Sequence, residues 1–218
     1  MKAWRMVAAC TLMVMLAATL AGAQMGMQGP PQFRGIWAPT VGSGAVYSVE
    51  QKRDKSEMEI AIVGAETHMG RPGHWFEMSM KGPQGPMVMK MLLAVQGEEV
   101  KPLRMIMQQG NEAMEMPMEM MGMGGARRSD YKSDFRKDAT RVGSETITVP
   151  AGTFVCDRWK LNDGSGEVWI AEKAGPWGMV KTVGKDSTMV LNKVLTNATT
   201  KITGPVKKFD MQEMMRRQ

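Results

Sequence analysis

The chain has 218 residues, of which 43% are hydrophobic and 23% are charged, and its formal net charge is +6. This length predicts a single domain that can bury a core without disulfides. The positive charges are scattered and belong to no recognisable binding motif, which argues against a nucleic-acid partner but allows peripheral contact with anionic lipid headgroups.

Residues 1–23 have the pattern of a secretory signal. Lys2 and Arg5 form a cationic start, residues 6–20 form an apolar core, and Ala21-Gly22-Ala23 is a small-residue cleavage site. We therefore expect cleavage after this site and export, so that the mature protein is periplasmic or secreted.

The chain contains two cysteines, Cys10 and Cys156. The tetrapeptide 7–10 resembles a lipobox, but hardly any apolar segment precedes Cys10, so we favour signal cleavage over lipidation. Cleavage would remove Cys10 and leave Cys156 as a lone thiol. Because Cys156 lies mid-strand beside Phe154, we interpret it as a small buried residue and not as a nucleophile.

Residues 24–44 are rich in Gly, Pro and Gln, which predicts an irregular N-terminal arm anchored by Phe33 and Trp37. Residues 45–200 are predicted to form an antiparallel β domain, because apolar and polar residues alternate over successive short segments. The apolar members of these segments are Met58, Ile60 and Ile62; His74, Phe76, Met78 and Met80; Met87, Met89, Met91, Leu93 and Val95; and Leu103, Met105 and Met107.

This alternation predicts a sheet with one apolar face and one largely polar face, on which Glu77 and Lys90 would meet water. Two helices are also expected. One lies between Ala126 and Ala139, with Ser129 as a candidate N-cap. The other falls in the basic tail of residues 201–218.

The most regular pattern runs from Gly143 to Lys181 and is typical of an antiparallel meander. Its strands are expected at 145–149, 153–161 and 167–171, each closed by a turn. Asp163-Gly164 should form the tightest turn, because both residues tolerate positive φ.

The meander also resembles a known group of proteins, on the residues Thr146–Phe154, Cys156, Trp169-Ile170 and Gly178–Lys181. It is similar to the second half of small secreted bacterial proteins of unknown function, whose sheet is of the lipoprotein-carrier (LolA/LolB-like) type. The resemblance implies a strongly curved antiparallel sheet, an incompletely closed barrel with one or two short helices. Its concave face would accept an acyl chain, and it carries no catalytic residue.

Motifs of common catalytic sites are absent from the sequence. There is no G-x-S-x-G, no P-loop, no C-x-x-C and no H-E-x-x-H, and a turn separates the only two histidines, His68 and His74. We therefore expect a protein that is not an enzyme and needs no cofactor.

Methionine is unusually frequent, with 26 residues in the chain. An unbranched thioether can fill a core or line an adaptable groove, and it is also a soft ligand for Cu(I). Where methionines share a face with Ile, Leu, Phe and Val we favour the apolar interpretation. The candidate ligand-binding residues are Phe76, Met78, Met80, Met89, Met91, Met105 and Met107.

The segment 114–123 is the one place where methionine has no Leu, Ile, Val or Phe beside it. As an edge strand it would extend the groove, whereas as a loop after Pro117 it could bring several sulfurs onto one Cu(I) ion. The candidate ligands of that alternative site are Met114, Met116, Met118 and Met120.

The leading hypothesis is an exported, non-catalytic protein that binds a hydrophobic ligand, either a lipid or a lipid-modified protein, near the outer membrane. The alternatives are a periplasmic Cu(I)-binding protein and a structural envelope protein with a filled core and no ligand.

Overall fold

The structure is a computed structural model that describes residues 34–52, 54–82, 85–118 and 131–209. The expected signal peptide, Phe33, Met120 and Ser129 lie outside the described residues.

The described residues form thirteen strands and one short helix. The strands are β1 (Gly44–Gln51), β2 (Asp54–His68), β3 (Arg71–Gly82), β4 (Gly85–Gln96), β5 (Glu99–Gln109), β6 (Glu112–Met116), β7 (Tyr131–Lys132), β8 (Ala139–Val149), β9 (Gly152–Leu161), β10 (Gly166–Ile170), β11 (Met179–Gly184), β12 (Ser187–Leu195) and β13 (Val206–Lys208), and the helix is η1 (Phe135–Asp138).

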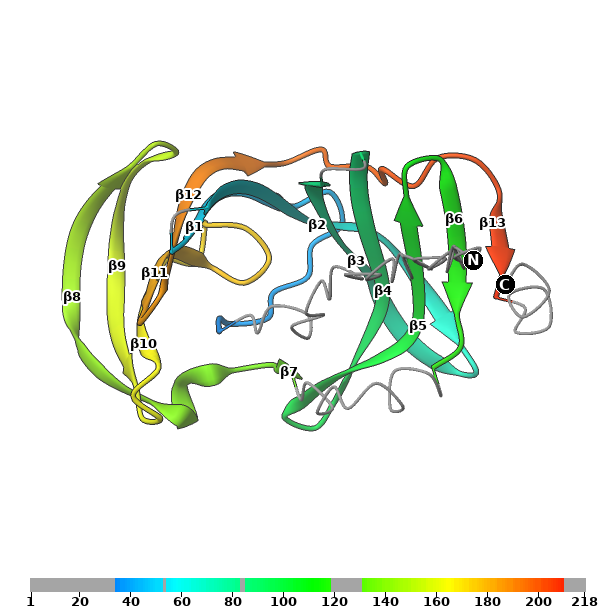
Figure 1. Cartoon of the computed structure of the whole chain (residues 1–218). Coiled ribbons are helices and arrows are strands. Elements are labelled where there is room, and N and C mark those ends of the chain that lie inside the picture. Colours follow the sequence, from blue (N-terminus) through cyan, green and yellow to red (C-terminus); the bar gives the residue numbers. More distant parts are fainter. Residues whose placement is uncertain (1–33, 53, 83–84, 119–130, 210–218) are drawn as a thin grey trace, which may run out of the picture.

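One curved sheet contains all thirteen strands, in the order β13-β6-β5-β4-β3-β2-β1-β12-β11-β10-β9-β8, with β7 paired to β5. The pairs are antiparallel except β13 with β6, which is parallel. In Figure 1, β8 and β13 lie at opposite ends of the sheet, so it curves without closing. The prediction of a mainly β protein with an incompletely closed sheet is confirmed.

Three local predictions differ from the structure. The only helix in the described part of Ala126–Ala139 is the four-residue 3-10 helix η1, capped by Asp134, whose carboxylate accepts from the Arg136 N–H. The tightest turn of the meander is Pro150-Ala151, a two-residue link between β8 and β9, and not Asp163-Gly164. In the tail, residues 206–208 form β13 and not a helix, because they pair with β6.

The inward face of the sheet carries the main core, and the N-terminal arm lies against it (Figure 1). Backbone bonds hold the arm: the Ile36 N–H donates to the Trp177 carbonyl at 3.0 Å, and the Trp37 N–H donates to the Ser133 carbonyl at 2.8 Å. The Trp37 ring packs on Trp177 at 4.7 Å between centroids and edge-on to Phe76 at 6.2 Å. Trp37 therefore anchors the arm inside the curve, as its sequence context suggested.

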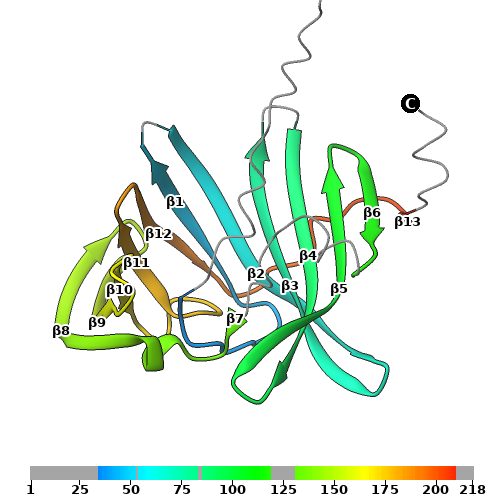
Figure 2. The ribbon, with the colours of Figure 1, turned by 60° about the horizontal axis from the view of Figure 1, so that its bottom comes forward.

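The outward face of β3–β6 is not simply polar, contrary to expectation. Trp75, Leu92, Ile106 and Ala113 form a second buried cluster there, and Ile202 packs against it. Residues 199–203, which we call the strap, lie over this face between β12 and β13, a path that Figure 2 shows. The strap buries Glu77 and Gln108, each only 3% exposed.

Candidate functional site

The seven candidate ligand-binding residues all lie on the inward face of β3, β4 and β5, where the strand pairing places them side by side. Phe76 pairs with Met91 and Met91 with Met105; Met78 pairs with Met89 and Met89 with Met107; Met80 pairs with Met87. Directly opposed residues of an antiparallel pair share a face. The structure therefore brings together the set that the alternation predicted.

Strand β6 extends these rows, because Met105 pairs with Met116 and Met107 pairs with Met114. We use the name methionine face for the inward-facing methionines of β3–β6. They are Met78, Met80, Met87, Met89, Met91, Met105, Met107, Met114 and Met116.

Burial decreases along the methionine face. Phe76 and Met91 are fully buried, and Met105 is 8% exposed. In the next row Met78 is 5% exposed, but Met89, Met107 and Met114 are only half-buried. Beyond them Met80 is half-buried and Met87 is 37% exposed. The face therefore begins in the core and ends as an accessible thioether surface.

The opposite side of the curve is filled differently. On β1, β10 and β12 the fully or nearly fully buried inward residues are Tyr47, Val168 and Leu191, and Trp177 packs against them from the loop before β11. Tyr47 donates its hydroxyl to the Met179 carbonyl at 2.9 Å, and burial raises its pKa. Mostly branched and aromatic residues, together with the buried Met179, thus fill this half, whereas methionine predominates in the half that stays partly open.

The candidate metal-ligating segment is split between strand and turn. Met114 and Met116 belong to β6, and Met118 lies in the turn after Pro117, packed against the core; Met120 lies outside the described residues. The strand places Met114 and Met116 on one face but two residues apart, a separation of about 7 Å. The residues directly opposite them are methionines of β5, Met107 opposite Met114 and Met105 opposite Met116.

Cys156 is fully buried in the main core. Burial, together with the negative charges of Glu145 and Asp157, raises the pKa of its thiol to about 11. A thiol with that pKa is almost entirely protonated at neutral pH and is a poor nucleophile. The predicted burial of Cys156 is therefore confirmed.

In the part of the chain that the structure describes, no three His, Cys, Asp or Glu side chains lie close enough together to hold a metal ion. A metal site in the described part of the chain would therefore have to use other donor atoms. The methionine face offers several thioether sulfurs for this purpose.

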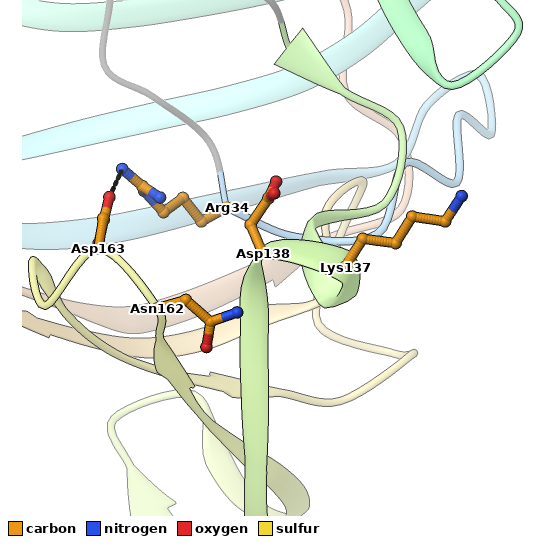
Figure 3. A pocket seen from close by; sticks show the side chains of 5 residues that line it. All are labelled: Arg34, Lys137, Asp138, Asn162 and Asp163. Atoms are coloured by element: carbon orange, nitrogen blue, oxygen red, sulfur yellow. Dashed lines mark hydrogen bonds and ion pairs between the residues drawn. The ribbon is translucent and has the colours of Figure 1, made fainter.

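A polar pocket of about 410 Å³ was not anticipated from the sequence (Figure 3). It is lined by Arg34, Lys137, Asp138, Asn162 and Asp163.

The charges around this pocket have partners within the chain. Arg34 pairs with Asp163 at 3.1 Å, Lys137 pairs with Glu98, and Asp138 pairs with Lys132. The pocket lies where the N-terminal arm, η1 and the turn after β9 meet.

Within the described ranges the structure contains no helix with the length and hydropathy of a membrane span.

No protein-family model matches the chain, and no curated protein matches it. Solved structures resemble it only distantly. A predicted lipoprotein from Parabacteroides distasonis ATCC 8503 is 17% identical, with 74% of this chain and 99% of that chain covered and a TM-score of 0.38. A predicted exported protein with a YmcC-like fold from Bacteroides fragilis NCTC 9343 is 13% identical, with coverages of 74% and 99% and a TM-score of 0.37.

MucB in its complex with MucA is 10% identical, at a TM-score of 0.40, and the match covers 76% of this chain but 54% of MucB. These matches do not confirm the resemblance to lipoprotein carriers of the LolA or LolB kind, which stays a prediction.

Proposed function

We propose that this chain is an exported, non-catalytic protein that binds a hydrophobic ligand, a lipid or the acyl group of a lipid-modified protein, on its methionine face. Export is supported by the cationic start, apolar core and cleavage site of residues 1–23.

The observation that carries the proposal is the half-buried row Met89–Met107–Met114 beside the exposed Met87. The accessible apolar side chains of this row continue the filled core. Covering them with an apolar ligand is favourable by about 25 cal/mol per Å² of apolar area removed from water. Because Met is unbranched and has three rotatable side-chain bonds, the same row can fit chains of different shape.

Native mass spectrometry of the protein purified from the cell envelope tests this proposal. We expect a retained lipid mass on the wild-type protein and its loss in Met107→Asp, which places a charge in the middle of the row. Val155→Asp is the matched control, since Val155 on β9 is 73% exposed and away from the methionine face, and it should keep the lipid.

A wild-type protein that carries no lipid would contradict the proposal and favour the structural envelope protein. Equal lipid retention in Met107→Asp and Val155→Asp would place the ligand elsewhere.

A further inference from the structure

The methionines of β4, β5 and β6 lie in a geometry that suits a soft metal ion, which goes beyond binding of an apolar ligand. Met89 pairs with Met107, and Met107 pairs with Met114, so three thioethers stand in one row on three adjacent strands. From these contacts we propose that Met89, Met107 and Met114 form a Cu(I) site.

Distance is the first requirement, and the strand spacing meets it. Neighbouring strands lie about 4.8 Å apart, so the outer two members of the row are separated by roughly 10 Å at the backbone. The sulfur of Met lies two single bonds beyond Cβ, and the side chains of Met89 and Met114 can lean toward Met107. An ion above Met107 can then approach all three sulfurs at about 2.3 Å, a usual metal–sulfur distance in proteins.

Methionines along a single strand are spaced too widely to form this site. Met114 and Met116 of β6 are about 7 Å apart, too far to share an ion directly. The register with β5 therefore moves the centre of the site from the segment 114–120 to Met107.

Accessibility is the second requirement. Met89, Met107 and Met114 are half-buried, whereas Met91 in the neighbouring row is fully buried and Met105 is 8% exposed. The row is thus the place where sulfur is both clustered and reachable.

Donor chemistry is the third requirement. Thioethers are soft donors that suit Cu(I), and a row of uncharged sulfurs has little affinity for a hard cation such as Mg²⁺. Lys207 of β13 continues the row beyond Met114, and its exposed side chain can carry the ammonium group out into water, away from the sulfurs.

Anaerobic titration with Cu(I) against a competing chelator such as bicinchoninate tests the site. We expect one ion per chain bound by the wild type, with X-ray absorption showing sulfur neighbours. Met107→Leu should weaken binding about tenfold or more, because even outer-shell partners of metal ligands change affinity by about 10- to 100-fold. Met58→Leu on β2 is the matched control, because Met58 is buried in the same core outside the methionine face, and it should bind like the wild type.

Leucine keeps the volume and the apolar character of methionine, so both variants are expected to fold, and their melting temperatures check this. Met114→Leu, at the edge of the sheet, gives a second test of the row if Met107→Leu folds poorly. Absence of Cu(I) binding by the wild type, or equal binding by Met107→Leu, Met114→Leu and Met58→Leu, would overturn the proposal.

Measurements on the wild type separate this inference from the proposed function. A retained lipid mass without Cu(I) binding would overturn this inference alone, whereas Cu(I) binding by a protein that retains no lipid would contradict the proposed function alone.

Discussion

Glu77 of β3 and Thr200 of the strap meet on the outward face of the sheet, where the Thr200 hydroxyl donates to Glu77 Oε2 at 2.5 Å. The Lys201 N–H donates to the other carboxylate oxygen at 2.7 Å. A carboxylate that is 3% exposed thus has both oxygens satisfied by a segment more than a hundred residues away in the sequence.

We predict that Glu77→Gln destabilises the protein by about 1–3 kcal/mol, because one carboxylate oxygen becomes an amide group that donates toward a donor. Chemical denaturation measures the change in the free energy of unfolding. Glu57→Gln, on the exposed part of β2, is the control and should lie within the error of the wild type. Equal stability of the two variants would mean that the strap does not hold Glu77 in solution.

Stability should also depend on pH through Glu115, whose carboxylate is paired with the guanidinium of Arg104. This guanidinium bonds Glu115 at 2.7 Å, and that bond lowers the pKa of the Glu115 carboxyl. A carboxyl whose folded pKa is depressed contributes stability above its unfolded pKa, and that contribution is lost as the pH falls through the folded value. Glu115→Gln should therefore cost up to about 1 kcal/mol at neutral pH.

Melting temperatures at acidic pH test this ion pair. Melting temperatures of wild type and Glu115→Gln should converge as the pH drops from about 5 toward 2, because the wild-type carboxyl becomes protonated. A constant gap between the two curves across that range would contradict the assignment.

Cys156 is predicted to be unreactive in the folded protein, since its thiol is buried and its pKa is raised to about 11. Labelling with a thiol reagent at pH 7 should be slow and should speed up greatly in denaturant. Cys156→Ser should cost about 1–3 kcal/mol, because it places a hydroxyl in an apolar site, and Cys156→Ala should cost less. Rapid labelling of the native protein would mean that the thiol is accessible.

Gly35 is predicted to be essential for docking of the N-terminal arm. A Cβ at this position would lie 2.1 Å from the Trp177 carbonyl oxygen, a backbone atom that cannot move aside easily. Gly35→Ala should therefore lower stability by about 1–3 kcal/mol, as overpacking does, and expose Trp37. Thermal melts measure this, with Gly143→Ala as the control, because a Cβ on Gly143 meets nothing within 4 Å.

The strand faces could be predicted from the sequence because alternation along a strand is a local property. The inward positions of Phe76, Met78 and Met91 follow from period two alone. Their alignment into rows could not be predicted, because it depends on register, and bulges between Ile62 and Gly64 and between Leu92 and Leu93 shift that register.

The strap could not be predicted for a related reason. Residues 199–203 have no period, and their contacts with Glu77 and Gln108 join parts of the chain about a hundred residues apart. From the sequence alone, therefore, Glu77 is expected to face solvent. The prediction of a longer helix around Phe135 was wrong for a similar reason, because long-range contacts decide the local structure. Phe135 is buried in the core and belongs to a single 3-10 turn, and residues 131–132 pair with β5.

The central claim is that an apolar ligand covers the half-buried part of the methionine face, and methyl NMR tests it most directly. Protein labelled with ¹³C at the methionine methyl groups is titrated with a fatty acid, and the signals are assigned with single Met→Leu variants. We predict saturable shifts for Met80, Met89, Met107 and Met114, and none for Met58 and Met179, which are 3% and 1% exposed. Unchanged signals from the four half-buried residues at saturating fatty acid would contradict the account.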